Sequence, residues 1–185
     1  MNDTPGTGHT QWYIGAPNGV MLCINECSSG IIRGVLFHSY STEGFPFSNV
    51  REMTSLMERL YNDLKFPHPG TNERTFAPEQ KNGPQPQMRP LKQPERKKIM
   101  SDSTLLSKHG DLGTFIVRVQ HRQNSSWQGR ITWMEEDKTI HFRSIWEMIK
   151  LIESAVDTVS PAQDDDEQEP DWFKGGDRPG EQTKA

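Results

Sequence analysis

The sequence predicts an α+β fold in which two duplicated repeats, each a β-hairpin, a short strand and a helix, pack as one pseudo-symmetric antiparallel sheet with two helices on one face. Three observations lead to this prediction: an internal repeat, an alternation of apolar and polar residues typical of strands, and a helix-capping signal in each repeat. The chain has 185 residues, of which 32% are hydrophobic and 25% charged. One or two small domains with long polar segments are therefore expected.

The internal repeat becomes visible when the chain is shifted by 95 residues without a gap. Identical residues then coincide at six places, and similar apolar residues fill the positions between them. The identical pairs are Gly34 and Gly129, Phe47 and Phe142, Glu52 and Glu147, Met53 and Met148, Leu56 and Leu151, and Glu58 and Glu153. Because both the spacing and the pattern recur, the sequence predicts an internal duplication.

Charge and proline content divide the chain into four parts. Residues 10–66 form the first repeat and residues 105–158 the second. Residues 67–104 are predicted to be a basic, Pro-rich linker, because seven of the thirteen prolines fall between Pro67 and Pro94. Residues 159–185 are predicted to be a disordered acidic tail, since eight acids and three bases give it a net charge of −5 while the rest of the chain carries +1.

The strands of the second repeat follow from its alternating pattern. Apolar or inward residues recur at every second position over 115–121 and again over 127–133. A hairpin centred on Asn124 pairs Val117 with Ile131 and Phe115 with Trp133, which gathers the apolar side chains on one face. A short third strand is predicted through Ile140 and Phe142.

Each repeat then continues into a helix whose start is marked by a capping box. Ser144 stands three residues before Glu147, and Asn49 stands three residues before Glu52. Apolar residues recur at helical spacing behind both signals. Since an isolated block of about 50 residues makes a marginal core, the two repeats are expected to pack together.

The outer faces of the two repeats differ. In the predicted register of the second repeat, Arg118 lies opposite Arg130 and Gln120 opposite Gln128, with Arg122 at the end of the strand. Like charges that oppose each other across strands are unfavourable unless an anion neutralises them, and such side chains contact phosphates, carboxylates or acidic peptides. The alternative is an ordinary solvated sheet face.

The first repeat carries an apolar outer face instead, formed by Met21, Cys23, Val35 and Phe37. Such a face needs a cover. An additional strand from residues 12–14 or a partner chain would supply it, and a strand from the same chain is the favoured alternative.

Two short motifs in the second hairpin resemble the cyclic-di-GMP signature of PilZ domains. Residues 118–122 spell R-x-x-x-R, and residues 124–129 spell N-x-S-x-x-G. The resemblance implies a cyclic-dinucleotide sensor in which these residues bind phosphate groups.

The second repeat also resembles an uncharacterised family of small bacterial proteins with an RVQ-x-RQN-x-SWQG hairpin and an FRS-x-x-E helix start. The matching residues are 118–120, 122–124, 126–129, 142–144 and Glu147. The resemblance implies a bacterial origin and a self-standing unit. The family has no known activity, so it implies no functional residues.

The acidic tail contains one feature beyond charge, the adjacent aromatic residues Trp172 and Phe173. Acidic residues that lead into a pair of aromatic rings are typical of short docking peptides, in which charge steers the encounter and ring burial gives specificity. The alternative is a tail that only increases solubility.

The sequence indicates no catalytic residues, no metal site and no cofactor. Cys23 and Cys27 are interpreted as structural thiols, the six histidines are scattered, and no phosphate-binding glycine loop or zinc-protease motif occurs. No stretch approaches the roughly 20 apolar residues that a membrane-spanning helix needs.

These observations favour a non-enzymatic binding or adaptor protein in the bacterial cytoplasm that presents a basic sheet face to an anionic partner. The expected binding residues are Arg118, Gln120, Arg122, Gln128 and Arg130. The partner is expected to be an acidic protein segment, with nucleic acid as an alternative, and a homodimer is left open. A small-molecule sensor, or an enzyme with a pocket between the repeats, is the rival hypothesis.

Overall fold

The computed structural model describes residues 14, 17–28, 30–69, 96–123 and 126–159. Six strands and three helices follow one another in this part of the chain. The strands are β1 (Gly19–Ser28), β2 (Ile31–His38), β3 (Phe45–Phe47), β4 (Gly113–Gln123), β5 (Ser126–Trp133) and β6 (Lys138–Phe142). The helices are α1 (Val50–Asp63), α2 (Asp102–Leu106) and α3 (Ile145–Val159).

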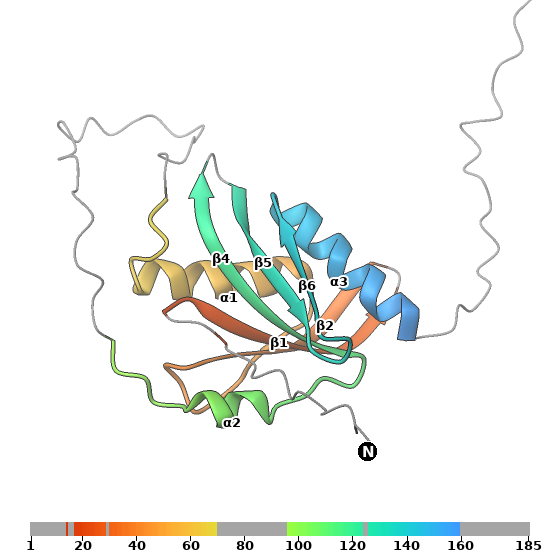
Figure 1. Cartoon of the computed structure of the whole chain (residues 1–185), viewed down its shortest axis with the longest axis horizontal. Coiled ribbons are helices and arrows are strands. Elements are labelled where there is room, and N and C mark those ends of the chain that lie inside the picture. Colours follow the sequence, from red (N-terminus) through yellow and green to blue (C-terminus); the bar gives the residue numbers. More distant parts are fainter. Residues whose placement is uncertain (1–13, 15–16, 29, 70–95, 124–125, 160–185) are drawn as a thin grey trace, which may run out of the picture.

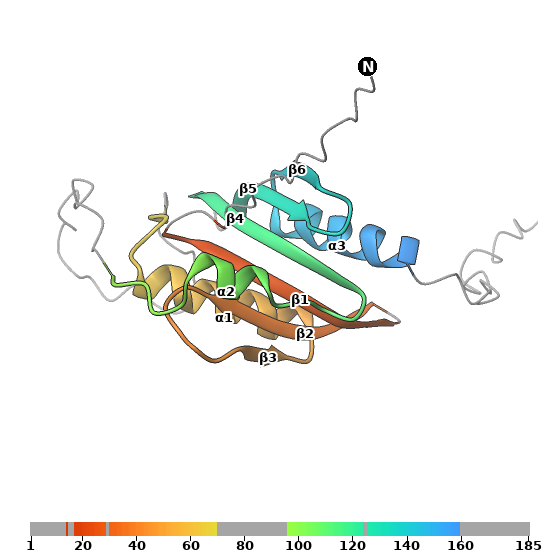
Figure 2. The ribbon, with the colours of Figure 1, turned by 60° about the horizontal axis from the view of Figure 1, so that its bottom comes forward.

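The six strands form one antiparallel sheet in the order β3-β2-β1-β4-β5-β6. The central pair, β1 and β4, runs in register from Gly19 opposite Arg118 to Ile24 opposite Gly113. Figure 1 shows α1 behind β4 and α3 beside β6, and Figure 2 shows α2 on the side opposite α1. The predicted α+β class with an antiparallel sheet is therefore confirmed. We call the segment from β1 to α1 the first half of the fold and the segment from β4 to α3 the second half.

The main core lies between the sheet and the two long helices. It joins inward residues of both central strands, such as Leu22 and Val117, to the apolar stripes of α1 and α3. Met53 and Met57 of α1 and Met148 and Ile152 of α3 are fully buried there. Because one continuous apolar cluster includes both helices, the two halves share a single core on one face of the sheet.

A second apolar cluster covers the central strands on the other face. It contains Ile14, Met21, Cys23, Met100, Leu105 and Ile116. The backbone N–H groups of Ile99 and Met100 donate to the carbonyl of Ser39 at 2.7 and 3.0 Å, which fixes the segment before α2 against the first half. Of the residues 12–14 predicted to form a covering strand, only Ile14 is described, and it is buried here without being part of a strand. Met100 and α2, which crosses the predicted boundary between the linker and the second repeat, supply the rest of the cover.

Both long helices begin where the capping signals place them. The side chain of Asn49 accepts from the N–H of Glu52 at 2.9 Å, and the hydroxyl of Ser144 accepts from the N–H of Glu147 at 3.1 Å. Each glutamate reaches back in turn and accepts from the backbone N–H that precedes the cap, at 2.8 Å from Ser48 and 2.7 Å from Arg143. The predicted helix starts are therefore confirmed.

The register predicted for the hairpin of β4 and β5 is correct as far as Val119 and wrong after it. Phe115 pairs with Trp133, Val117 with Ile131 and Arg118 with Arg130, as predicted. After Val119 the register shifts at a β-bulge, so that His121 pairs with Gln128 and Arg122 with Trp127. A bulge adds one residue to one strand and therefore reverses the face on which every later side chain lies.

A bulge interrupts the first hairpin at the same place. The register between β1 and β2 shifts between Ile24 and Glu26, so that Asn25 is the extra residue. Cys27 then pairs with Ile32 and packs against the main core. Asn25 and Gln120, the two extra residues, are separated by the spacing of the sequence repeat.

Several predictions fall outside the described residues. Most of the predicted linker and the acidic tail, with Trp172 and Phe173, are among them. None of the helices in the described ranges combines the length and the apolar character that crossing a bilayer requires.

Candidate functional site: a basic row and two equivalent cavities

A basic row of three residues crosses the outer face of the second half. Arg118 of β4 pairs with Arg130 of β5, and Arg130 pairs with His141 of β6. Their strand neighbours Val117, Ile131 and Phe142 are buried in the main core, so the row points to the opposite face. His141 is exposed and the two arginines are half-buried.

The two glutamines of the predicted site lie near this row but not opposite each other. Gln128 is exposed and pairs with His121, which is also exposed. Gln120 is the extra residue of the bulge and is exposed. The predicted pairing of Gln120 with Gln128 is therefore wrong, because the bulge moves the next residue into that place.

Arg122 does not belong to the outer face, and its predicted placement there is wrong. The bulge turns it towards the helices, where only 6% of its side chain is exposed. Its guanidinium donates to Oδ1 of Asn62 at 2.7 Å and to the carbonyl of Pro67 at 3.4 Å, and it lies 3.5 Å from the carboxylate of Glu58. Arg122 therefore joins β4 of the second half to the end of α1 in the first half.

Two aromatic rings complete the surroundings of Arg122. The guanidinium carbon lies 5.9 Å from the centre of the Tyr61 ring, and Tyr61 meets Trp127 edge to face at 5.5 Å. Burial raises the pKa of the Tyr61 hydroxyl far above its ordinary value, so the group is protonated at neutral pH.

The two arginines of the R-x-x-x-R motif, Arg118 and Arg122, lie on opposite faces of the sheet because the bulge falls between them. A single ligand cannot contact both.

The sequence reasoning missed two histidines on the outer face. His141 completes the basic row, and His121 stands beside Gln128. The alternation of His141 with the inward Phe142 was enough to place it outward, whereas His121 was assigned to the inner face because the bulge was not foreseen.

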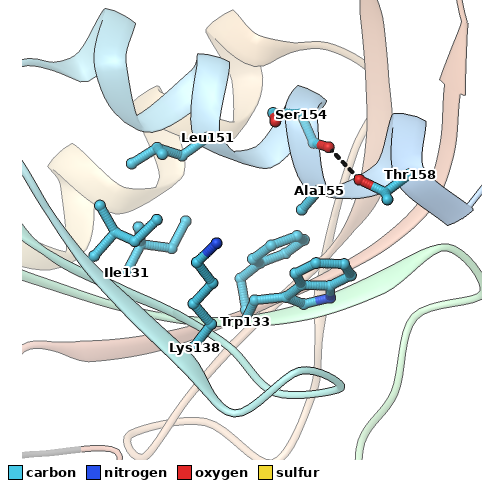
Figure 3. Close-up of a pocket in the computed structure, with 9 residues that line it drawn as sticks. Ile131, Trp133, Lys138, Leu151, Ser154, Ala155 and Thr158 are labelled. Carbon is cyan, nitrogen blue, oxygen red and sulfur yellow. Dashed lines mark hydrogen bonds between the residues drawn. The ribbon is translucent and has the colours of Figure 1, made fainter.

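A cavity of about 120 Å³ lies under the second half, between the sheet and α3. Figure 3 shows Lys138 pointing from β6 into this space, towards Leu151 of α3. Apart from Lys138, the lining is apolar or carries small hydroxyls. The lining residues are Phe115, Ile131, Trp133, Lys138, Ile140, Leu151, Ser154, Ala155 and Thr158.

A larger cavity of about 280 Å³ lies under the first half, between β2, β3 and α1. Its lining is far more polar. The residues are Leu36, His38, Tyr40, Ser41, Phe45, Leu56, Arg59, Leu60, Asp63 and Arg96.

The residues that line the two cavities correspond in the sequence. Seven residues of the first-half cavity, moved by the 95-residue spacing of the repeat, fall on residues that line the second-half cavity. Three of the seven differ in chemical character: His38 stands where the second half has Trp133, Arg59 where it has Ser154, and Asp63 where it has Thr158. The two linings therefore correspond at seven positions of the sequence and differ in chemical character at three of them.

The two cysteines do not form a metal site with each other. Cys23 is buried on the face covered by α2, whereas Cys27 packs on the opposite face against the main core. Burial raises the pKa of the Cys23 thiol to about 11 and also raises that of Cys27, so both are protonated at neutral pH. Among the described residues, no group of three or more His, Cys, Asp or Glu side chains gathers closely enough to hold a metal ion.

Comparison of the chain with models of known protein families, with curated proteins and with solved structures gave no match.

Proposed function

We propose that the protein is a non-enzymatic binding or adaptor protein that uses the outer face of β4 to β6 to bind an anionic partner. The observation that carries the proposal is the basic row, in which Arg118, Arg130 and His141 are direct neighbours on three adjacent strands. An anion placed over the row contacts the side chains of two neighbouring arginines, Arg118 and Arg130, at once. Arginine also presents its donors in a planar fork that fits carboxylates and phosphates.

An acidic protein segment suits this face better than nucleic acid does. Adjacent strands lie about 4.8 Å apart, so the row extends over about 10 Å and matches two or three carboxylates of an extended peptide. Recognition of single-stranded nucleic acid relies on bases stacked upon aromatic rings. The outer positions next to the row carry Gln128 and Thr132 of β5 and Thr139 of β6 instead.

The experiment measures binding of fluorescent peptides and oligonucleotides to the full chain by anisotropy. An acidic hexapeptide of Glu and Asp is expected to bind to the unmodified protein, and the Arg118→Gln/Arg130→Gln variant is expected to bind it at least about tenfold more weakly, since each charged hydrogen bond contributes about 1.5–3 kcal/mol. The matched control is Arg51→Gln/Lys97→Gln, which removes two exposed positive charges elsewhere.

Three results would count against the proposal. Equal losses in the two double variants would indicate nonspecific attraction to net charge, and no binding of the acidic peptide would remove the basis for an acidic partner. Tighter binding of a 12-nucleotide single strand, with an affinity that falls steeply with salt, would favour nucleic acid instead.

We further infer that the two halves arose by internal duplication and are related by a pseudo-twofold axis between β1 and β4. Three features at matching positions support this inference. The hairpin bulges lie at Asn25 and Gln120, and the cavities share seven equivalent lining positions. In addition, Gly34 pairs with Phe47 just as Gly129 pairs with Phe142.

A further inference from the structure

We propose that the first-half cavity is a binding site for a small organic anion, a molecule with one carboxylate or phosphate group on a compact apolar body. This site lies on the helix side of the sheet and is built by the first half together with Arg96 from the segment before α2. It is therefore independent of the basic row, which belongs to the outer face of the second half.

The first argument is the convergence of polar groups from separate segments. His38 is the last residue of β2, Arg59 and Asp63 come from α1, and Arg96 comes from the segment that leads to α2. Tyr40, which follows β2, also lines the cavity, and its hydroxyl donates to the carbonyl of Pro17 at 2.8 Å. Arg96 lies 4.0 Å from Asp63, so this pair is close to neutral as a whole. Arg59 then supplies a further positive charge, and a monoanion complements the cavity.

The second argument concerns hydrogen bonding around the histidine. The backbone N–H of Tyr40 donates to Nδ1 of His38 at 3.2 Å. Burial lowers the pKa of His38 below its ordinary value, so the ring is neutral at pH 7 and its proton is on Nε2. His38 thus offers a donor for an anionic oxygen without adding a charge.

The third argument is the shape of the apolar part. The rings of His38 and Phe45 stack with centres 5.0 Å apart and planes 24° apart. Leu36, Leu56 and Leu60 line the remainder of the cavity. A volume of about 280 Å³ corresponds to about nine water molecules at roughly 30 Å³ each, which is enough for a single ring with one charged substituent.

A comparison of the two cavities indicates that the first-half cavity is more than a gap in the packing. The second-half cavity shows what the fold leaves empty when the lining is mostly apolar, about 120 Å³. The first-half cavity is more than twice as large, and ionisable residues replace Trp133, Ser154 and Thr158 at the equivalent positions. Small-molecule sites are typically lined by an apolar wall with a few polar groups that fix the orientation of the ligand, and the first-half cavity has both parts.

The test is an NMR titration of the full chain, labelled with ¹⁵N, against four probes of similar size. Benzoate and phenyl phosphate are expected to give saturable shifts of the Tyr40 and Arg59 amides. Benzyl alcohol and benzylammonium are expected to bind at least about tenfold more weakly, because they lack the anionic group. The two anions also distinguish a carboxylate site from a phosphate site.

Variants assign the shifts to the cavity. Arg59→Gln/Arg96→Gln is expected to weaken benzoate binding at least about tenfold, since it removes both positive charges of the lining. Asp63→Asn is expected to strengthen it, because it removes the carboxylate that competes for Arg96. Lys138→Gln, in the equivalent second-half cavity, is the matched control and should leave the affinity unchanged.

The proposal fails if none of the probes gives saturable shifts, or if benzyl alcohol binds as tightly as benzoate. It also fails if Arg59→Gln/Arg96→Gln binds like the unmodified protein. Shifts confined to Arg130 and His141, abolished in Arg118→Gln/Arg130→Gln, would assign the anion to the outer face and so support the proposed function while overturning this site.

Discussion

Removal of the Arg122 side chain is expected to destabilise the protein, because this residue connects the two halves. Only 6% of the side chain is exposed, and the guanidinium makes one short hydrogen bond, to Asn62 at 2.7 Å. A hydrogen bond to a charged group contributes about 1.5–3 kcal/mol, and burial of the methylene stem adds about 0.8 kcal/mol per group. The contact with Glu58 adds little, since that carboxylate is 44% exposed.

Part of this gain is offset by the loss of hydration of the guanidinium. The net cost of Arg122→Ala is therefore expected to be about 2–4 kcal/mol, which corresponds to a fall in melting temperature of about 5–15 °C for a domain of this size. Arg122→Met keeps most of the apolar stem and removes the buried charge. It should cost about half as much as the alanine substitution.

The assay is urea unfolding followed by far-ultraviolet circular dichroism, with Arg118→Ala as the matched control on the same strand. Arg118 lies on the outer face, so its replacement should change the free energy of unfolding by less than about 0.5 kcal/mol. An Arg122→Ala variant as stable as Arg118→Ala would refute the reasoning. That result would mean that the contacts of Arg122 with α1 contribute no stability, and it would favour the outer face as the place of its side chain.

Two further predictions follow from particular contacts. Gly34→Ala and Gly129→Ala should each lower the free energy of unfolding in urea by about 1–3 kcal/mol. A Cβ at either position would meet a backbone carbonyl of the adjacent strand and the ring of the paired phenylalanine. An unchanged free energy of unfolding for either variant would contradict the equivalence of the two glycines. Hydrogen bonds from the backbone and side chain of Arg143 lower the pKa of Glu147 from its ordinary value of 4.5, so its stabilising effect is present at pH 7 and is lost as the pH falls through the lowered pKa. Thermal unfolding of Glu147→Gln should therefore differ from that of the unmodified protein at pH 7 and converge with it once the pH lies below the lowered pKa, whereas a difference that persists at still lower pH would indicate a cause other than ionisation.

The sequence was sufficient to predict the class of the fold, the helix starts and most of one hairpin register. These features depend on local rules. Ser144 with Glu147 caps a helix whatever surrounds it, and the pairing of Val117 with Ile131 follows from the alternation of apolar residues. Helix α2 was not foreseen because it has only five residues and is stabilised by packing, through Leu105, onto the face that contains Cys23.

The cavities were also beyond the reach of sequence reasoning, because each depends on how a helix lies over its strands. The repeat gave the positional equivalence of Arg59 and Ser154, but nothing in the sequence indicated that both line an empty space. Arg96 was assigned to a linker, and its proximity to Asp63 is a long-range contact with no local signal.

The face of Arg122 illustrates the general difficulty most clearly. In a strand, one inserted residue reverses every later side chain, and Gln120, His121 and Arg122 are all polar, so no apolar residue marks the reversal. The corresponding residues of the first hairpin are more informative, since among Asn25, Glu26 and Cys27 the cysteine alone packs into the core. Comparing the two hairpins therefore identifies the inward position, and an arginine placed there requires buried partners. Those partners, Asn62 and Glu58, are supplied by α1 of the other half, so the inward position of Arg122 in the second half depends on contacts that only the first half provides.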